Sequence, residues 1–189
     1  MSSNHGANLY DLSSKLGLNK NELMDFSSNI NPLGSSRLAK QAVIDNIDMV
    51  SIYPDPSYHD LKLSISNYCC CATDNILLGS GATELISSFI NIVSPKKAVL
   101  LSPSYSEYEK ELSKSNCIIN KFFSKKENLF KVNVDEFINF INSDCNDIVV
   151  ICNPNNPTGF AFSNGEMKKI LENTNALIMV DEIFIHLLN

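Results

Sequence analysis

From residue 75 onward, short apolar segments alternate with helix-like segments along the chain. The apolar segments are predicted strands, with the sequences "NILLGS", "AVLLS", "CIINKFF", "DIVVIC" and "ALIMVDE". The segments between them are predicted helices, with the sequences "ATELISSFINIV", "SEYEKELSKSN", "NVDEFINFIN" and "NGEMKKILEN". Strands that are apolar throughout and separated by helices form a parallel sheet that is covered on both faces. The sequence therefore predicts an α/β fold with a mostly parallel sheet flanked by helices.

The first part of the chain lacks this alternation. The segment "LMDFSSNINPLGSS" starts extended and is broken by a proline and a glycine. A helix is predicted over about 36–48, "IYPDPSY" then interrupts the chain with two prolines, and a second helix is predicted over about 58–70. We therefore expect residues 1–50 to form an extended N-terminal arm and helix, and residues 51–189 to form the α/β domain.

Composition and charge restrict the partners. The 189 residues are enough for one domain, and the net charge of −6 without runs of like charge predicts no nucleic-acid partner. The N-terminus has no signal-peptide pattern and no apolar run is long enough to cross a bilayer, so we expect no membrane partner and a cytoplasmic location. The six cysteines form no CxxC pair. They predict reduced thiols and no metal site.

Four polar loops follow predicted strands, at the edge of a parallel sheet where ligands bind. They have the sequences "GSGATE", "SPSYSEY", "NPNNPTG" and "DEIF". In the first loop, glycines let the backbone approach an anion, the following helix offers free N–H groups and a positive dipole end, and Thr83 adds a hydroxyl. The loop suits a phosphate, and a structural turn before an N-capped helix explains it equally well. It is not a Walker loop, because no Gly-Lys-Ser/Thr follows.

Each of the other three loops carries one candidate ligand-binding residue. Tyr105 and Asp181 each have two interpretations, and Asn156 has an amide that its loop restrains. Tyr105 beyond a strand end suits stacking on a flat ring, or it covers the sheet edge. Asp181 at the end of an apolar strand requires a partner, and either a protonated heterocycle nitrogen or a helix N-terminus supplies one. Asn156 lies between rigid prolines, which hold its amide at a set angle for a ligand hydroxyl or oxyanion.

Taken in this order, the four loops resemble the large domain of fold-type I pyridoxal-phosphate enzymes of the class I/II aminotransferase group, and "NPNNPTG" is the most specific piece. The resemblance covers this whole chain but only the first part of a family chain, which implies an incomplete large domain. The segments "HGAN", "DFSSNINPLG" and "YPDP" are similar to the opening of the threonine-phosphate decarboxylase branch of cobalamin biosynthesis. Histidinol-phosphate aminotransferases are related, but they lack the "HGxN" start, so we favour the decarboxylase branch.

The resemblance implies pyridoxal 5'-phosphate as cofactor, a homodimer, and a small phosphorylated amino acid or amine as substrate. It implies that Gly81, Ala82 and Thr83 hold the cofactor phosphate and that Tyr105 stacks on the pyridine ring. Tyr53 is expected to reach the phosphate of the dimer partner's cofactor.

The remaining implied roles concern the ring substituents and the substrate. Asn156 is expected to hydrogen-bond the phenolic oxygen of the cofactor, and Asp181 to pair with the protonated ring nitrogen, which keeps the ring an electron sink. His5 and Asn29 are expected to lie near the substrate.

One feature of family enzymes is not found after Asp181. These enzymes use a downstream lysine for the Schiff base and arginines for the substrate carboxylate, whereas only "EIFIHLLN" follows Asp181 and the chain has a single arginine, Arg37. We therefore assign no catalytic residue and expect this chain alone to be inactive. The open hypotheses are a decarboxylase, a histidinol-phosphate aminotransferase, and a non-catalytic remnant or binding module. A dinucleotide-binding domain is disfavoured because "GSGATE" lacks the third glycine.

Overall fold

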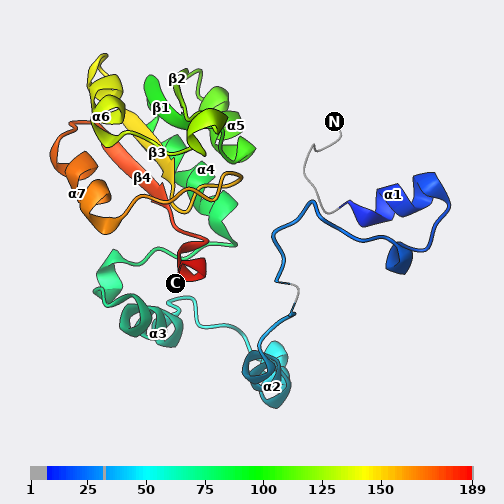
Figure 1. Cartoon of the computed structure of the whole chain (residues 1–189). Helices are drawn as coiled ribbons and strands as arrows, with labels where there is room; N and C mark the ends of the chain where they lie inside the picture. Colours follow the sequence, from blue (N-terminus) through cyan, green and yellow to red (C-terminus); the bar gives the residue numbers. More distant parts are fainter. Residues whose placement is uncertain (1–7, 32, 189) are drawn as a thin grey trace. The chain divides into compact units, whose positions relative to one another are not determined.

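The computed structural model describes residues 8–31 and 33–188, and it divides the chain into two compact units (Figure 1). The first unit ends at Ser64 and the second begins at Ile65. Among the helices of the described residues, none is long and apolar enough to cross a membrane.

The first unit consists of short helices joined by extended segments. Its elements are α1 (Leu9–Leu16), η1 (Lys20–Glu22), α2 (Arg37–Asp45), η2 (Ile47–Ser51) and the beginning of α3 (His59–Cys69). The helices α2 and α3 confirm the two predicted ones. Helix α1 was not expected from the apolar pattern, but its ends have clear local causes. The Asn8 side chain accepts a hydrogen bond from the Asp11 N–H at 3.3 Å, and the helix ends at Gly17 with a φ of 65°.

The second unit contains a parallel sheet with its connecting helices. The strands are β1 (Lys97–Ser102), β2 (Ile118–Phe123), β3 (Ile148–Cys152) and β4 (Leu177–Asp181). The helices are α4 (Ala82–Val93), α5 (Ser106–Lys114), α6 (Val134–Asn142) and α7 (Asn164–Glu172), with short 3-10 turns η3 (Thr73–Asn75), η4 (Lys126–Asn128) and η5 (Ile185–Leu187). The strand order is β2-β1-β3-β4, and every pairing is parallel. The predicted α/β fold is confirmed.

The prediction of a strand in "NILLGS" is wrong for this structure. Residues 76–79 follow η3 without any secondary structure, and Leu77 is exposed. A strand is stabilised by the hydrogen bonds that a neighbouring strand supplies. The sheet that the described residues form consists of β1 to β4 and offers this segment no pairing.

Two apolar clusters lie on opposite faces of the sheet, because side chains alternate along β1 and β3. Val99, Leu101, Val149 and Ile151 pack with residues of α6 and α7. Ala98, Leu100, Ile148 and Val150 pack with residues of α4 and α5. Figure 1 shows the resulting three layers, with α4 and α5 on one side of the strands and α6 and α7 on the other. The carboxyl ends of β1, β3 and β4 consequently meet at one edge.

At the opposite edge, Asp147 holds the beginnings of two strands. Its Oδ2 accepts hydrogen bonds from the backbone N–H groups of Lys96 at 2.7 Å and Lys97 at 3.0 Å. These bonds favour the charged carboxylate and hold the pKa of Asp147 below its ordinary value of 3.8. The unfolded chain therefore binds the proton first as the pH falls.

We expect Asp147→Asn to make the stability of the second unit less sensitive to acid. A lowered pKa in the folded state contributes stability above the ordinary pKa, and this contribution is lost as the pH falls through the folded value. Urea denaturation at about pH 6 and about pH 3 measures the loss for each chain. The parent chain should lose more stability than the variant, whereas Asp74→Asn at an exposed position should behave like the parent. An equal loss for the parent and Asp147→Asn would contradict the role of these bonds.

Candidate functional site

The beginning of α4 offers an anion-binding backbone. Gly81 precedes the helix with a φ of 88°, a conformation that favours glycine, and a Cβ built there would meet nothing within 4 Å. Ala82 and Thr83 form the first turn of the helix, where N–H groups have no partner within the helix, and Thr83 is exposed. The Glu84 carboxylate already accepts a hydrogen bond from the N–H of Ser80 beside this turn. The geometry suits an anion with room to approach the backbone.

Tyr105 lies at the beginning of α5, directly after the loop that follows β1. Its half-buried ring packs against the same apolar cluster as Ala82 of α4. Its ring also meets the ring of Tyr108 edge-on, with centroids 5.6 Å apart and an interplanar angle of 84°. The start of α4 and the ring of Tyr105 therefore belong to the same face of the sheet.

Asp181 is the last residue of β4, and both of its carboxylate oxygens are engaged. Oδ2 accepts a hydrogen bond from the hydroxyl of Tyr108 at 2.6 Å, and Oδ1 accepts one from the backbone N–H of Ile183 at 3.0 Å. Burial, followed by this hydrogen bond, raises the pKa of Tyr108 far above its ordinary value, so Tyr108 remains the proton donor. The Asp181 carboxylate thus accepts one hydrogen bond from the turn that follows it and a second one from α5, which is distant in the sequence.

Two of the three asparagines in "NPNNPTG" build the loop rather than offer groups to a ligand. The buried Asn153 binds the backbone of Phe162 twice, accepting from its N–H at 2.7 Å and donating to its carbonyl at 3.3 Å. The buried Asn155 donates from Nδ2 to the Pro103 carbonyl at 2.9 Å and to the Thr158 hydroxyl at 2.8 Å. The Oδ1 atom of Asn155 is buried without a hydrogen-bond partner among the described residues.

Asn156 differs from both neighbours. It is half-buried, and its side-chain amide makes no hydrogen bond with the described part of the chain. The two buried asparagines fix the surrounding backbone, so that this amide is held by its loop while its donors and acceptor remain available. This arrangement suits a hydrogen bond to a ligand oxygen.

Backbone and side-chain hydrogen bonds join these loops. Cys152 at the end of β3 pairs in register with Asp181, and the N–H of Asn153 donates to the Asp181 carbonyl at 2.8 Å. The bond from Asn155 to Pro103 ties this loop to the one that precedes Tyr105. Three of the four predicted ligand loops therefore belong to one connected edge, at the carboxyl ends of β1, β3 and β4, while Ala82 at the start of α4 packs against the same apolar cluster as Tyr105.

Sequence reasoning did not identify the residues that connect this edge. The sequence patterns assign no role to Tyr108, Asn153 or Asn155. The position of Tyr108 on the buried side of α5 was readable from the helical spacing with Leu112. The hydrogen bond from Tyr108 to Asp181 could not be predicted from that spacing, because the two residues are 73 positions apart. The described residues contain no group of three or more His, Cys, Asp or Glu side chains that would hold a metal.

The other predicted residues belong to the first unit or lie outside the described residues. Tyr53 and Asn29 are both exposed side chains of the first unit. His5 lies outside the described residues. The placement of these three residues near a cofactor or substrate therefore stays a prediction.

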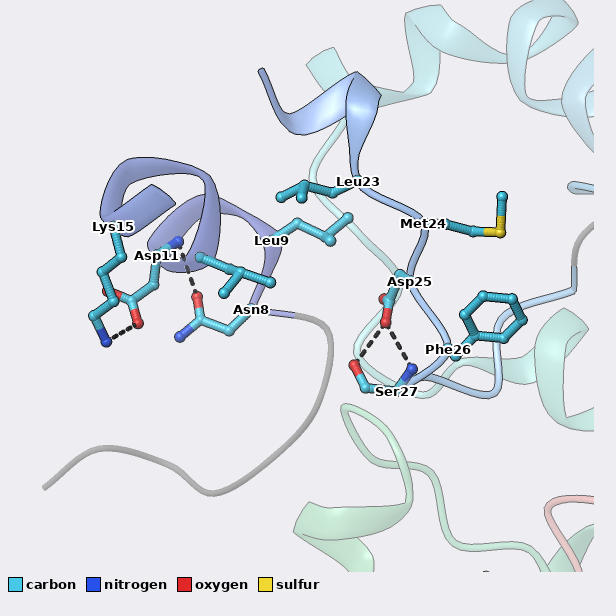
Figure 2. A pocket seen from close by; sticks show the side chains of 10 residues that line it. Asn8, Leu9, Asp11, Lys15, Leu23, Met24, Asp25, Phe26 and Ser27 are labelled. Carbon is cyan, nitrogen blue, oxygen red and sulfur yellow. Dashed lines mark hydrogen bonds and ion pairs between the residues drawn. The ribbon is translucent and has the colours of Figure 1, made fainter. Parts of the chain in front are cut away.

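The first unit also contains a hollow of about 540 Å³, which Figure 2 shows. It is lined by Asn8, Leu9, Asp11, Leu12, Lys15 and residues 23–27. Asn8 caps α1, and Asp25 accepts hydrogen bonds from the Ser27 backbone at 2.7 Å and hydroxyl at 2.6 Å (Figure 2). Asn8, the last residue of "HGAN", and Asp25, the first residue of "DFSSNINPLG", thus both line this hollow, and their polar groups organise the local backbone.

Comparisons with known proteins identify the family. The sequence pattern of the family "Aminotransferase class I and II" matches residues 15–189. The bifunctional adenosylcobalamin biosynthesis protein CobDQ of Leptospira interrogans is 38% identical over 188 residues, covering 96% of this chain and 21% of that protein. The threonine-phosphate decarboxylase of Salmonella typhimurium is 32% identical over 184 residues, covering 96% of this chain and 50% of that protein.

Solved structures share the fold. The histidinol-phosphate aminotransferase of Clostridium acetobutylicum has a TM-score of 0.75 at 32% identity, covering 86% of this chain and 48% of that one. The histidinol-phosphate aminotransferase of Sinorhizobium meliloti, solved with pyridoxal 5'-phosphate, has a TM-score of 0.80 at 16% identity, covering 97% of this chain and 50% of that one. The chain spans at most about half the length of these relatives and corresponds to their N-terminal portion. By sequence and by fold, the chain belongs to the class I and II aminotransferase family.

Proposed function

We propose that this chain forms the cofactor-binding portion of a pyridoxal-phosphate enzyme that acts on a small phosphorylated amino acid, as threonine-phosphate decarboxylases do. The observation that carries the proposal is the Asp181 carboxylate, fixed at the end of β4 beside the "NPNNPTG" loop. A carboxylate held in this way is a suitable partner for a protonated ring nitrogen. The family, and the neighbours whose structures contain pyridoxal 5'-phosphate, indicate this cofactor.

The residues of the second unit fit the groups of this cofactor. Gly81 and the N–H groups of Ala82 and Thr83 in the first turn of α4 would receive the phosphate, and the open space beside Gly81 admits it. The ring of Tyr105 would cover one face of the pyridine. The amide of Asn156 would donate to the phenolic oxygen, and Asp181 would pair with the ring nitrogen. When bound, the cofactor withdraws electrons from the α-carbon of an amino acid.

The finer assignment to the decarboxylase branch is supported by the N-terminal segments and by similarity. Three curated relatives named for threonine-phosphate decarboxylation or for adenosylcobalamin biosynthesis are 32–38% identical to this chain, and five named as histidinol-phosphate aminotransferases are 28–31% identical. We propose that the intact protein is a cytoplasmic homodimer in which Tyr53 reaches the partner's cofactor, with His5 and Asn29 near the substrate. We also keep residues 1–50 as the proposed arm and 51–189 as the proposed large-domain portion.

Amino transfer on histidinol phosphate is the second candidate, favoured by the 32% identity to the Clostridium acetobutylicum structure. A chain extended to the length of the curated relatives separates the two when it is assayed with L-threonine O-3-phosphate and with histidinol phosphate. Release of carbon dioxide without amino transfer supports the decarboxylase, and amino transfer to a keto acid supports the alternative. Because no lysine follows Asp181 here, we propose that the 189 residues alone catalyse neither reaction. If the extended chain shows neither activity, that result would favour the binding-module hypothesis.

Binding of free pyridoxal 5'-phosphate tests the site in this chain directly. We expect saturable, non-covalent binding, and we expect Asp181→Asn to weaken it about tenfold or more because a charge-assisted hydrogen bond is lost. Isothermal titration calorimetry measures both affinities. Glu182→Gln is the matched control, since Glu182 is the adjacent exposed acid. Equal weakening by both substitutions would contradict a specific role for Asp181.

A further inference from the structure

Tyr108 is a buried side chain that touches two residues of the proposed cofactor site. It lies on α5 with 0% of its surface exposed, and it packs with Leu112 in the cluster on the α4 and α5 face of the sheet. Its hydroxyl donates to Oδ2 of Asp181 at 2.6 Å, and its ring meets the Tyr105 ring edge-on at 5.6 Å. One residue therefore links the residue proposed to cover the pyridine ring with the residue proposed to bind its nitrogen.

We propose that Tyr108 is a positioning residue that aims the Asp181 carboxylate at the ring nitrogen of the cofactor. This inference rests on the proposed function and adds a residue to it. The Tyr108 hydroxyl and the Ile183 N–H each hold one oxygen of the carboxylate, so the group is fixed against rotation. An ionised carboxylate has about four acceptor positions, and two of them remain for a ligand.

The direction of the proton in this pair follows from the surroundings of Tyr108. Tyr108 is fully buried in an apolar cluster that also contains Ile86, Leu112 and Val150, and Cys152 belongs to the same cluster. Burial disfavours the phenolate, so the hydroxyl donates and Asp181 accepts. In this pair Oδ2 of Asp181 is the acceptor, and a carboxylate oxygen that accepts can also receive an N–H from a ring.

A simpler explanation is that a buried tyrosine hydroxyl needs any hydrogen-bond partner and finds one in Asp181. Under that explanation, removal of the hydroxyl lowers stability and weakens every ligand of the site equally. A positioning role instead predicts a loss that depends on the ring nitrogen. Two ligands that differ at that atom separate the explanations.

We therefore compare Tyr108→Phe with the parent chain for pyridoxal 5'-phosphate and for its analogue with a C–H in place of the ring nitrogen. The phenylalanine keeps the ring and its contact with Tyr105. We expect the affinity for pyridoxal 5'-phosphate to fall about three- to tenfold, because the charge-assisted hydrogen bond between Asp181 and the ring nitrogen is weakened. The affinity for the analogue should stay unchanged. In an Asp181→Asn background, Tyr108→Phe should have no further effect on either ligand.

Equal weakening for both ligands, or no weakening for pyridoxal 5'-phosphate, would overturn the positioning role. If the parent chain does not distinguish the two ligands, the proposed role of Asp181 fails, which is a different result. A cofactor-free measurement then still decides about Tyr108. Hydrogen exchange of the Ile183 amide should become severalfold faster in Tyr108→Phe than in the parent, because the released carboxylate no longer holds that N–H. The amide of Val150 in β3 is the internal reference, and an unchanged ratio of the two exchange rates contradicts the inference.

Discussion

Replacing Phe137 with alanine should lower the free energy of unfolding of the second unit by about 3–5 kcal/mol, the usual cost of emptying a buried aromatic position. Phe137 lies on α6 and is 0% exposed. Its ring meets Phe122 of β2 at 5.1 Å between centroids and stacks with Phe162 at 6.1 Å and 14°. These contacts join a helix, an edge strand and the segment after the "NPNNPTG" loop, so no single neighbour can move to fill the space.

Urea denaturation followed by tyrosine fluorescence measures this loss, since the chain has no tryptophan and Tyr108 is buried in the same unit. Phe123→Ala is the matched control, because Phe123 lies on β2 but is 63% exposed. It should cost less than about 1 kcal/mol. If the two substitutions destabilise the unit equally, the cluster on the α6 and α7 face is not the core that supports this side of the sheet.

Most elements of the second unit were predictable from the sequence, and the exceptions have physical causes. Segments such as 148–152 are apolar at every position, which is the pattern of a strand buried on both faces, and the structure has β3 there. The segment 76–79 has the same pattern, but it is not a strand because pairing is a property of two segments, and the described part of the chain gives it no neighbour. Helix α1 was not predicted because its sequence signals are the capping residues Asn8 and Gly17 rather than a helical pattern of apolar positions.

The candidate site was predictable as a set of loops but not as a set of contacts. The carboxyl ends of parallel strands lie at one edge, so the sequence placed "NPNNPTG" and Asp181 together, and the pairing of Cys152 with Asp181 agrees. No local pattern announces that Tyr108 donates to Asp181, since the two residues are 73 positions apart. The prolines of the loop predicted a ligand-binding amide at Asn156. The neighbouring Asn153 and Asn155 instead form hydrogen bonds that stabilise the fold.

Because Asn153 stabilises the loop while Asn156 remains available to a ligand, the second large expected effect is a loss of stability on substitution of Asn153. Asn153→Ala should lower the free energy of unfolding by about 2–4 kcal/mol, because the N–H and the carbonyl of the buried Phe162 both lose their side-chain partner and each unsatisfied buried group costs about 1–3 kcal/mol. Denaturation with urea measures the loss. Asn153→Asp keeps an acceptor for the Phe162 N–H in either charge state, but only its protonated carboxyl has an O–H that can donate to the Phe162 carbonyl, so its cost should be smaller at a pH where the carboxyl is protonated than at a pH where it is ionised.

Asn156→Ala is the control for that experiment, and it should show the opposite pattern. Its side-chain amide has no hydrogen bond with the described residues, so its removal should change the free energy of unfolding by less than about 0.5 kcal/mol. It should instead weaken the binding of pyridoxal 5'-phosphate severalfold, because a hydrogen bond to the phenolic oxygen is lost. Stability loss in Asn156→Ala without a change in affinity would mean that all three asparagines serve the fold. The opposite outcome would assign to Asn156 the contact with the cofactor, on a backbone that Asn153 and Asn155 hold in place.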